Sequence, residues 1–206
     1  NTFNIRNKGM KLRAGKRGTK PKIFPSIKYA DAVKFKERFN STANTSVSTF
    51  ATSIATIKYE SKKTDPNINI TGTDENYLLT SGYKIAEGRN FSIDEINYGR
   101  HVIIIGEEIR NIVFGVNNAI GEVIAVGSNK YKVIGILEKK GSSMGFGGDK
   151  NCLIPIINPR QYFSYPNQSY TISCLANGPE ELDSKIGEAI SEMRVVRGLR
   201  PIEEDN

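Results

Sequence analysis

The chain has 206 residues, of which 38% are hydrophobic, 25% charged and 9% aromatic, so it can form a packed core and is not a disordered chain. With two cysteines and one histidine, it cannot build a four-ligand structural zinc site without carboxylates. The sequence contains no run of about 18 apolar residues, so it predicts no transmembrane helix within this chain. The chain starts at Asn1 without a signal-peptide pattern, and we expect it to be a piece of a longer protein.

The formal net charge of +7 is concentrated near the start of the chain. Residues 1–40 hold 12 Lys and Arg against 2 Asp and Glu, whereas residues 41–206 are net acidic. The excess falls in the segment KGMKLRAGKRGTKPK. Such a cluster suits the phosphates of nucleic acid or of anionic lipid headgroups, and it is equally typical of a solvated arm. Both interpretations stay open.

Hydrophobic periodicity predicts the elements of the first half of the chain. We expect a short strand within 3–13, a helix over 26–39, one long or bent strand over 45–60, a strand over 68–74 and a short helix over 75–82. Gly82 is placed to end that last helix.

The second half of the chain begins with a helix-start signal. Ser92 and Glu95 have the spacing of a capping box. Two apolar runs around a Gly-Ser-Asn turn predict a β-hairpin over 121–138. The other expected elements are a buried strand over 100–106, a helix from it to Gly115, a Gly/Ser-rich loop over 139–150, strands over 151–156 and 169–176, and a helix over 179–198.

This order of elements predicts an α+β fold with two lobes. One α+β lobe is built from both chain ends, residues 1–66 together with 157–206. A β-rich lobe, residues 67–156, is inserted between them. The sequence contains no internal repeat that would favour another organisation.

A search for catalytic or binding motifs yields no active site. The chain lacks a phosphate-binding P-loop, a nucleophile elbow and metal-protease or EF-hand motifs. His101 is the only candidate base and is expected to be a structural residue at the start of an apolar strand. Cys152 and Cys174 are expected to be buried thiols in strands, although a disulfide stays open. We therefore predict no catalytic residue, no metal and no cofactor.

Four segments in the middle of the chain carry a family resemblance: TGTDENYLLTSGYKIAEGRNFS, HVIIIGEEIRNIVFG, IGEVIAVGSNKYKVIGILEKKG and LIPI. In this order they resemble the MacB-type periplasmic core domain of ABC-transporter permeases, a superfamily of macrolide exporters, lipoprotein-releasing systems and FtsX-like proteins. The matching positions are Gly72, Tyr77, Gly82, Gly88, Arg89, Phe91, Gly106, Phe114, Gly115, Gly121, Val133, Gly135 and Pro155. We expect them to maintain the fold, with Pro155 ending a strand near a sheet edge.

The resemblance implies an inner-membrane transport protein whose periplasmic domain, between the first two of four transmembrane helices, is non-catalytic. That domain would couple ATP-driven motion to the handling of a periplasmic substrate or partner, as in efflux. The implied partners are an ABC ATPase domain or subunit, the rest of the permease, a second permease copy and a periplasmic adaptor. The two chain ends would lie close together, with the basic arm beside the membrane headgroups.

The loop over 139–150 is the candidate partner-contact loop. Met144 and Phe146 are its apolar side chains, and Asp149 adds a charge. Two other functions are alternatives to transport: a nucleic-acid-binding module that uses the basic arm, and a hydrolase that uses His101. The hairpin lacks a row of aromatic residues for base stacking, so we expect no nucleic-acid partner.

Overall fold

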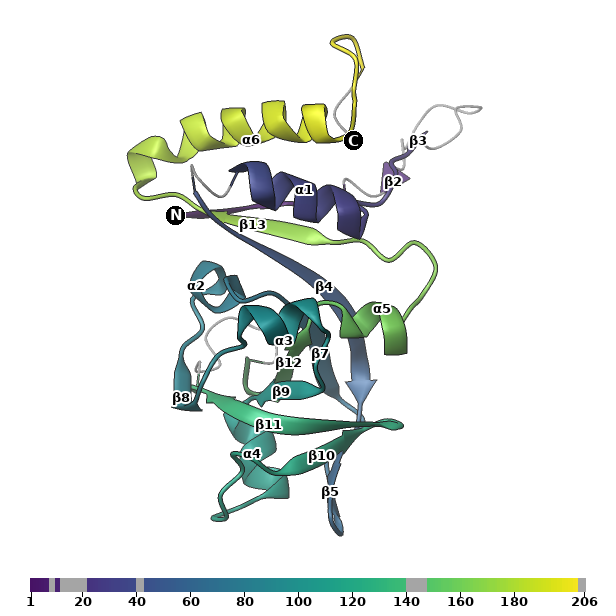
Figure 1. The fold of residues 1–206 in the computed structure, drawn as a ribbon, viewed down its shortest axis with the longest axis vertical. Coiled ribbons are helices and arrows are strands. Elements are labelled where there is room, and N and C mark those ends of the chain that lie inside the picture. Colours follow the sequence, from purple (N-terminus) through teal and green to yellow (C-terminus); the bar gives the residue numbers. More distant parts are fainter. Residues whose placement is uncertain (8–9, 12–21, 40–42, 140–147, 204–206) are drawn as a thin grey trace. The chain divides into compact units, whose positions relative to one another are not determined.

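The computed structural model describes residues 1–7, 10–11, 22–39, 43–139 and 148–203. The chain forms two compact units (Figure 1). Unit 1 comprises Asn1–Val47 and Pro166–Asn206, and unit 2 is the continuous segment Ser48–Tyr165. These borders differ from the expected 66/67 and 156/157, because most of the long strand after Val47 pairs with strands of unit 2.

Unit 1 contains helices and a small sheet in the strand order β1-β13-β4, to which β4 contributes its first residues. Helices α1 and α6 pack against each other and contact the strands of this sheet. A short β2-β3 ladder stands apart from it. The elements are β1 Thr2–Ile5, β2 Met10–Lys11, β3 Lys22–Ile23, α1 Tyr29–Phe39, β4 Asn44–Ala55, β13 Thr171–Leu175, the 3-10 turn η3 Pro179–Glu181 and α6 Leu182–Val196.

The core of unit 1 comes from residues spaced along one face of each helix. Phe35 and Phe39, one turn apart on α1, stack with their ring centroids 5.0 Å apart. Met193 on α6 is buried, as is Cys174 on β13. Arg38 of α1 forms an ion pair with Glu192 of α6, which ties the two helices together at the surface.

Unit 2 is a curved sheet in the order β4-β7-β12-β9-β11-β10-β5-β6, with β8 paired to β11. The β7-β12 and β9-β11 pairs are parallel, and the other described pairs are antiparallel. Its strands are β5 Ile57–Tyr59, β6 Lys62–Lys63, β7 Ile68–Thr73, β8 Ile85–Gly88, β9 Val102–Ile105, β10 Val123–Val126, β11 Asn129–Leu137 and β12 Asn151–Pro155. Its helices are α2 Tyr77–Ser81, α3 Ile93–Asn97, α4 Glu107–Val113, the turn η2 Gly148–Lys150 and α5 Asn158–Tyr162.

The strands β4 and β5 close this sheet on itself. Only Thr56 separates them, so they form the single bent strand that the sequence predicts over 45–60. β4 pairs with β7 at one end of the strand order, while β5 pairs with β10 at the other. The same stretch of chain thus joins both ends of the sheet, as in a small barrel.

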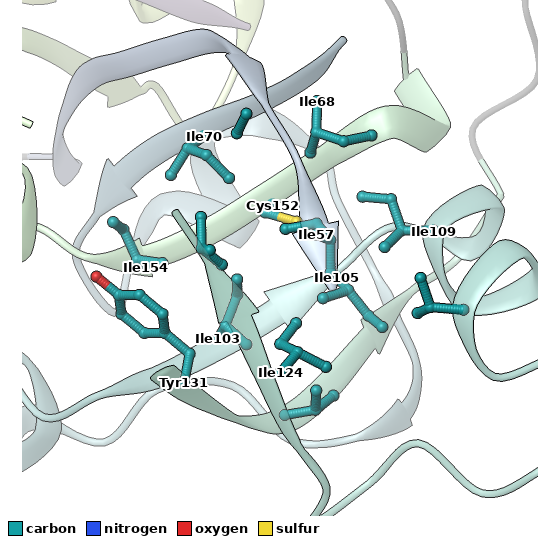
Figure 2. Close-up of a cluster of buried hydrophobic side chains, with 14 of the residues drawn as sticks. Ile57, Ile68, Ile70, Ile103, Ile105, Ile109, Ile124, Tyr131, Cys152 and Ile154 are labelled. Carbon is teal, nitrogen blue, oxygen red and sulfur yellow. The ribbon is translucent and has the colours of Figure 1, made fainter. Parts of the chain in front are cut away.

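The inside of this barrel is filled by β-branched and aromatic side chains (Figure 2). Ile57, Ile105 and Tyr131 come from three different strands, and each is fully buried. Burying one such side chain stabilises the fold by about 1.5–3 kcal/mol, so this cluster is the main source of stability in unit 2.

The local predictions are largely confirmed. Ser92 and Glu95 form the capping box, and Gly82 ends α2 with a left-handed φ of 64°. The hairpin forms with Val126 opposite Asn129. The expected position of Pro155 near an edge is wrong, because β12 lies between β7 and β9. Pro155 is tolerated there because the ladder with β9 includes only Cys152 and Leu153.

Candidate partner-contact site

The predicted contact loop is described only at its end. Met144 and Phe146 lie outside the described residues. Asp149 is half-buried in η2, directly before β12. The loop therefore leads directly into β12, a strand of the unit 2 sheet.

The end of this loop is held against the start of α4. The carbonyl oxygen of Asp149 lies 2.3 Å from where a Cβ on Gly106 would stand, so only glycine fits at that position. The Gly106 N–H donates to the carbonyl of Asn151 at 2.9 Å. Lys150 forms a 3.3 Å ion pair with Glu108 in the first turn of α4. These contacts fix where the loop ends.

Arg89 has a structural role, because it holds the Glu95 side chain at the start of α3. Its guanidinium donates to both carboxylate oxygens of Glu95, at 2.8 and 2.7 Å. The Ser92 hydroxyl accepts from the Glu95 N–H at 3.2 Å, and the Glu95 carboxylate accepts from the Ser92 N–H at 2.9 Å. Hydrogen bonding to Arg89 lowers the pKa of Glu95 to about 2. The donors from Arg89 and from the Ser92 N–H therefore hold this carboxylate at the start of α3.

His101 does not sit in a catalytic arrangement. Its Nε2 is 2.8 Å from the Tyr162 hydroxyl, and its ring stacks on Tyr131 at 5.2 Å between centroids. Its hydrogen-bond partner is thus a phenol, whereas a general base of the Ser-His-Asp type is oriented by a carboxylate. Among the described residues there is also no group of three or more His, Cys, Asp or Glu that could hold a metal ion.

The two cysteines are buried and are not paired with each other. Burial raises the pKa of the Cys152 thiol strongly and that of the Cys174 thiol to about 11. A thiol reacts as its thiolate, so both are inert near neutral pH. The prediction of two buried thiols in strands is confirmed.

An apolar groove in unit 1 was not predicted. It has a volume of about 320 Å³ and lies between β1 and α6. Its lining residues are Phe3, Asn4, Ile5, Arg6, Ile186, Ala189, Ile190, Met193, Arg194, Arg197 and Leu199. The spacing of Ile186 and Ile190, one helical turn apart on α6, is the sequence signal that could have indicated the groove. In the structure, Ile190 keeps 47% of its surface exposed.

Two of the arginines that line this groove, Arg194 and Arg197, donate hydrogen bonds to backbone carbonyls within unit 1. The Arg197 guanidinium donates to the carbonyls of Pro25 and Ser26, and burial lowers its pKa. Arg194 donates to the carbonyls of Arg200 and Pro201 beyond the end of α6. They stabilise the ends of the elements that form the groove.

The basic arm falls mostly outside the described residues, which omit 8–9 and 12–21. Among the helices that the structure describes, none has the length and hydropathy needed to cross a membrane.

A family model, described as a MacB-like periplasmic core domain, matches residues 1–186. This chain belongs to that family. The match covers all of unit 2, the first segment of unit 1 and residues 166–186 of its second segment. The resemblance noted in the middle of the sequence is thereby confirmed.

Curated relatives of this MacB-like domain are much longer proteins. The macrolide export ATP-binding/permease protein MacB of Chromobacterium violaceum is 34% identical over 88 residues, which is 43% of this chain and 13% of that protein. The protein of the same name from Hahella chejuensis is 29% identical over 140 residues, 65% of this chain and 20% of the relative. The chain thus spans a fifth or less of these two relatives.

Solved structures share the fold of the MacB-like domain. The periplasmic region of MacB from Actinobacillus actinomycetemcomitans aligns with a TM-score of 0.71 at 18% identity, covering 96% of this chain and 85% of that one. The extracellular domain of the noncanonic ABC-type transporter YknZ from Gram-positive bacteria gives a TM-score of 0.65 at 20% identity, covering 85% and 86%. The predicted α+β class is confirmed.

The positions that carried the resemblance lie in the framework of unit 2. Phe91, Phe114 and Val133 are buried. Gly88 and Gly135 face each other where β8 pairs with β11, and a Cβ on Gly88 would lie 2.3 Å from the Ile134 carbonyl oxygen. The other positions that carried the resemblance lie at or near the ends of strands and helices: Gly72, Tyr77, Gly106, Gly115, Gly121 and Pro155. Their role in this family remains our prediction, and they bring no catalytic side chains together.

Proposed function

We propose that this MacB-like domain is the extracytoplasmic part of an ABC-transporter permease and has no catalytic role of its own. Family membership over residues 1–186 is the observation that carries this proposal. The names of the relatives, which are ATP-binding/permease proteins and an ABC-type transporter, support it. The inert thiols and the phenol-bound His101 agree with a binding or coupling role.

The coupling step is proposed from the path of the chain. Both chain ends belong to unit 1, and unit 2 is inserted between Val47 and Pro166. A movement of membrane segments joined to either end would reach unit 1 first. β4, a single strand with residues in both units, would pass that movement to unit 2. Hydrogen-bonded strands transmit displacement because packed interiors are hard to compress.

The partners follow from this role. They are an ABC ATPase domain or subunit in the cytoplasm, the rest of the permease and a second copy of it. A periplasmic adaptor is a further partner, contacted through the loop that contains Met144, Phe146 and Asp149. Lys and Arg of the basic arm would lie at anionic headgroups, where each basic residue contributes about 1 kcal/mol.

The side of the membrane can be tested with one cysteine in the full-length protein. Ser128 is exposed in the hairpin turn, so Ser128→Cys gives a reactive thiol. In intact cells, a membrane-impermeant maleimide is expected to label Ser128→Cys. The parent protein, in which Cys152 and Cys174 of this domain are buried, is the matched control and should be labelled less. Labelling that appears only after the cells are lysed would place the domain in the cytoplasm and refute the proposal.

The coupling step needs a separate measurement. In the full-length transporter in lipid nanodiscs, ATP is expected to change amide hydrogen exchange in β4 and β13, with ADP as the control. Identical exchange under both nucleotides while ATP is being hydrolysed would contradict coupling through this domain. That result would leave the labelling test of its location unaffected.

A further inference from the structure

Four exposed lysines gather on one face of the sheet in unit 2. They are Lys63 on β6, Lys58 on β5, and Lys130 and Lys132 on β11. The strands β5, β10 and β11 are neighbours, as Figure 1 shows. Lysines that are up to 74 positions apart in the chain, from Lys58 to Lys132, thus lie on one surface.

The strand register aligns three of these lysines in a row. Lys63 lies opposite Lys58, Lys58 lies opposite Ala125 on β10, and Ala125 lies opposite Lys130. Residues directly opposite each other in a sheet project from the same face. Lys132 lies two residues further along β11, opposite Val123, and belongs to the same face.

Burial confirms which face this is. Ile124 on β10 and Tyr131 on β11 point into the core, with exposed fractions of 0%. Their neighbours Val123, Lys130 and Lys132 are exposed, so the lysine face is the outer one. A shallow hollow of about 310 Å³ lies on it, lined by Lys58, Glu60, Val123, Ile124, Ala125 and Lys130. Small and apolar side chains thus form its floor between cationic walls.

These lysines make no ion pair with any residue in the described part of the chain. Glu60 is the carboxylate that lines the hollow, and the nearby Glu122 accepts a hydrogen bond from Tyr59 at 2.9 Å. Like charges directly opposite in a sheet, such as Lys58 and Lys63, destabilise it. The arrangement therefore costs stability without a compensating ion pair among the residues that the structure describes.

Protection of a sheet edge does not account for the whole face. Lysines on an edge strand hinder pairing with another chain, which is a sufficient reason for Lys63 on β6. Lys130 and Lys132 lie on β11, and at Lys132 this strand is paired with both β9 and β10, so edge protection does not explain this pair of lysines. Their presence on the same face as Lys58 points instead to recognition of negative charge.

We propose that this lysine face docks the acidic face of a helix in a partner protein. Adjacent strands are about 4.8 Å apart, so the row from β6 to β11 is about 14 Å long, the length of about nine or ten helical residues. Carboxylates at i, i+3 and i+10 lie on one side of a helix and match the row, which runs across the strands. An apolar side chain between them fits over Val123 and Ala125. Charge complementarity of this kind governs association rate and orientation more than final affinity.

The test uses the ¹⁵N-labelled 206-residue chain and two synthetic helical peptides of identical composition. One peptide places its glutamates along one face, and the other distributes them around the helix. The one-faced peptide is expected to shift the amide resonances of β5, β10 and β11, and its binding should weaken as salt rises. Equal binding of both peptides would overturn the proposal.

Charge reversal identifies the surface. Lys58→Glu combined with Lys130→Glu is expected to weaken binding of the one-faced peptide about tenfold. The matched control, Lys28→Glu with Lys84→Glu, changes the net charge equally at exposed sites elsewhere and should stay within about twofold. Thermal unfolding of each variant checks that it is folded. Equal weakening by both pairs would refute a specific surface.

A membrane is the competing occupant. Vesicles of phosphatidylglycerol, added to the same labelled chain, should leave the β5, β10 and β11 resonances unchanged if the partner is a protein. Shifts of those resonances by vesicles, together with no shifts by the one-faced peptide, would overturn the proposal in favour of a lipid surface.

Discussion

At the scale of single residues, the polar side chains of this domain serve the fold. Arg89 and Ser92 supply the donors around the Glu95 carboxylate, and His101 is held between Tyr131 and Tyr162. The resemblance to the family drew attention to Arg89, but its partner was not predicted. The capping box identified Glu95 independently, and the structure joins the two signals in one cluster.

The Arg89–Glu95 pair makes stability depend on pH. The pKa of Glu95 is about 2 in the folded chain, below its ordinary value of 4.5. The ionised carboxylate therefore stabilises the fold fully above about pH 4.5, and this stabilisation is lost as the pH falls toward 2. Because 55% of the Arg89 side chain is exposed, we expect Glu95→Gln to lower the free energy of unfolding by only about 1 kcal/mol at pH 7.

Chemical denaturation at pH 7 and pH 3 measures this effect, which should shrink at the lower pH. Glutamine retains the capping box, so the change isolates the charge. The control is Glu188→Gln, which removes an exposed ion pair with Lys185 and should change stability little. An equal loss for Glu95→Gln at both pH values would contradict the assignment of the effect to the carboxylate.

Burial predicts the reactivity of the two thiols. At pH 8, Cys152 and Cys174 should react with a maleimide only after denaturant is added, because burial raises the pKa of both and blocks access. Mass spectrometry over time gives the number of labels. Rapid labelling of the native chain, at the rate of an unstructured cysteine peptide, would show that one of these strands opens readily.

At the scale of elements, close approach between segments decides where glycine is needed. The end of the Gly/Ser-rich loop passes over Gly106 at the start of α4, and β8 pairs with β11 where Gly88 lies opposite Gly135. These are contacts between segments far apart in sequence. The family resemblance marked the positions, whereas the reason for each glycine comes from its neighbours in space.

The Gly106 contact gives a stability prediction. A Cβ at this position would lie 2.3 Å from the carbonyl oxygen of Asp149, so Gly106→Ala should lower the free energy of unfolding by about 1–3 kcal/mol. Gly187→Ala on α6 is the control, since nothing lies within 4 Å of its Cβ position, and it should raise stability by about 0.5–1 kcal/mol. Urea unfolding of both variants measures the difference, and a neutral Gly106→Ala would mean that the loop shifts freely.

At the scale of the whole molecule, the chain builds unit 1 from its two ends and unit 2 from the segment between them. Unit 2 has its own core, centred on residues such as Ile105 and Tyr131. Unit 1 needs β1, α1, β13 and α6, which come from both ends of the chain. The two units therefore differ in their capacity to fold alone.

A fragment of residues 48–165 is accordingly expected to fold by itself, with a cooperative thermal transition and dispersed NMR resonances. A chain that joins 1–47 to 166–206 through a short Gly/Ser linker tests unit 1 in the same way. A fragment 48–165 without a cooperative transition would show that the core of unit 2 depends on contacts outside it. Circular dichroism during heating is sufficient to distinguish these outcomes.

The amino-acid sequence by itself determined the elements whose signals are local. The spacing of Ser92 and Glu95, the glycine at position 82 and the alternation in the hairpin over 121–138 depend on neighbours within a few residues. Their physical basis is a hydrogen bond or dihedral angle inside one turn, and each was predicted. The family could also be recognised, because its marks recur in order along the chain.

Only the tertiary structure decided which strands are neighbours. The closure of the barrel through β4 and β5, the addition of β8 to β11 and the interior position of Pro155 depend on pairs of segments distant in sequence. The lysine face and the groove between β1 and α6 exist for the same reason. Bringing segments that are distant in sequence together costs loop-closure entropy, and local sequence patterns do not show whether this cost is met. The free energy that offsets it comes from burying apolar side chains in the shared core.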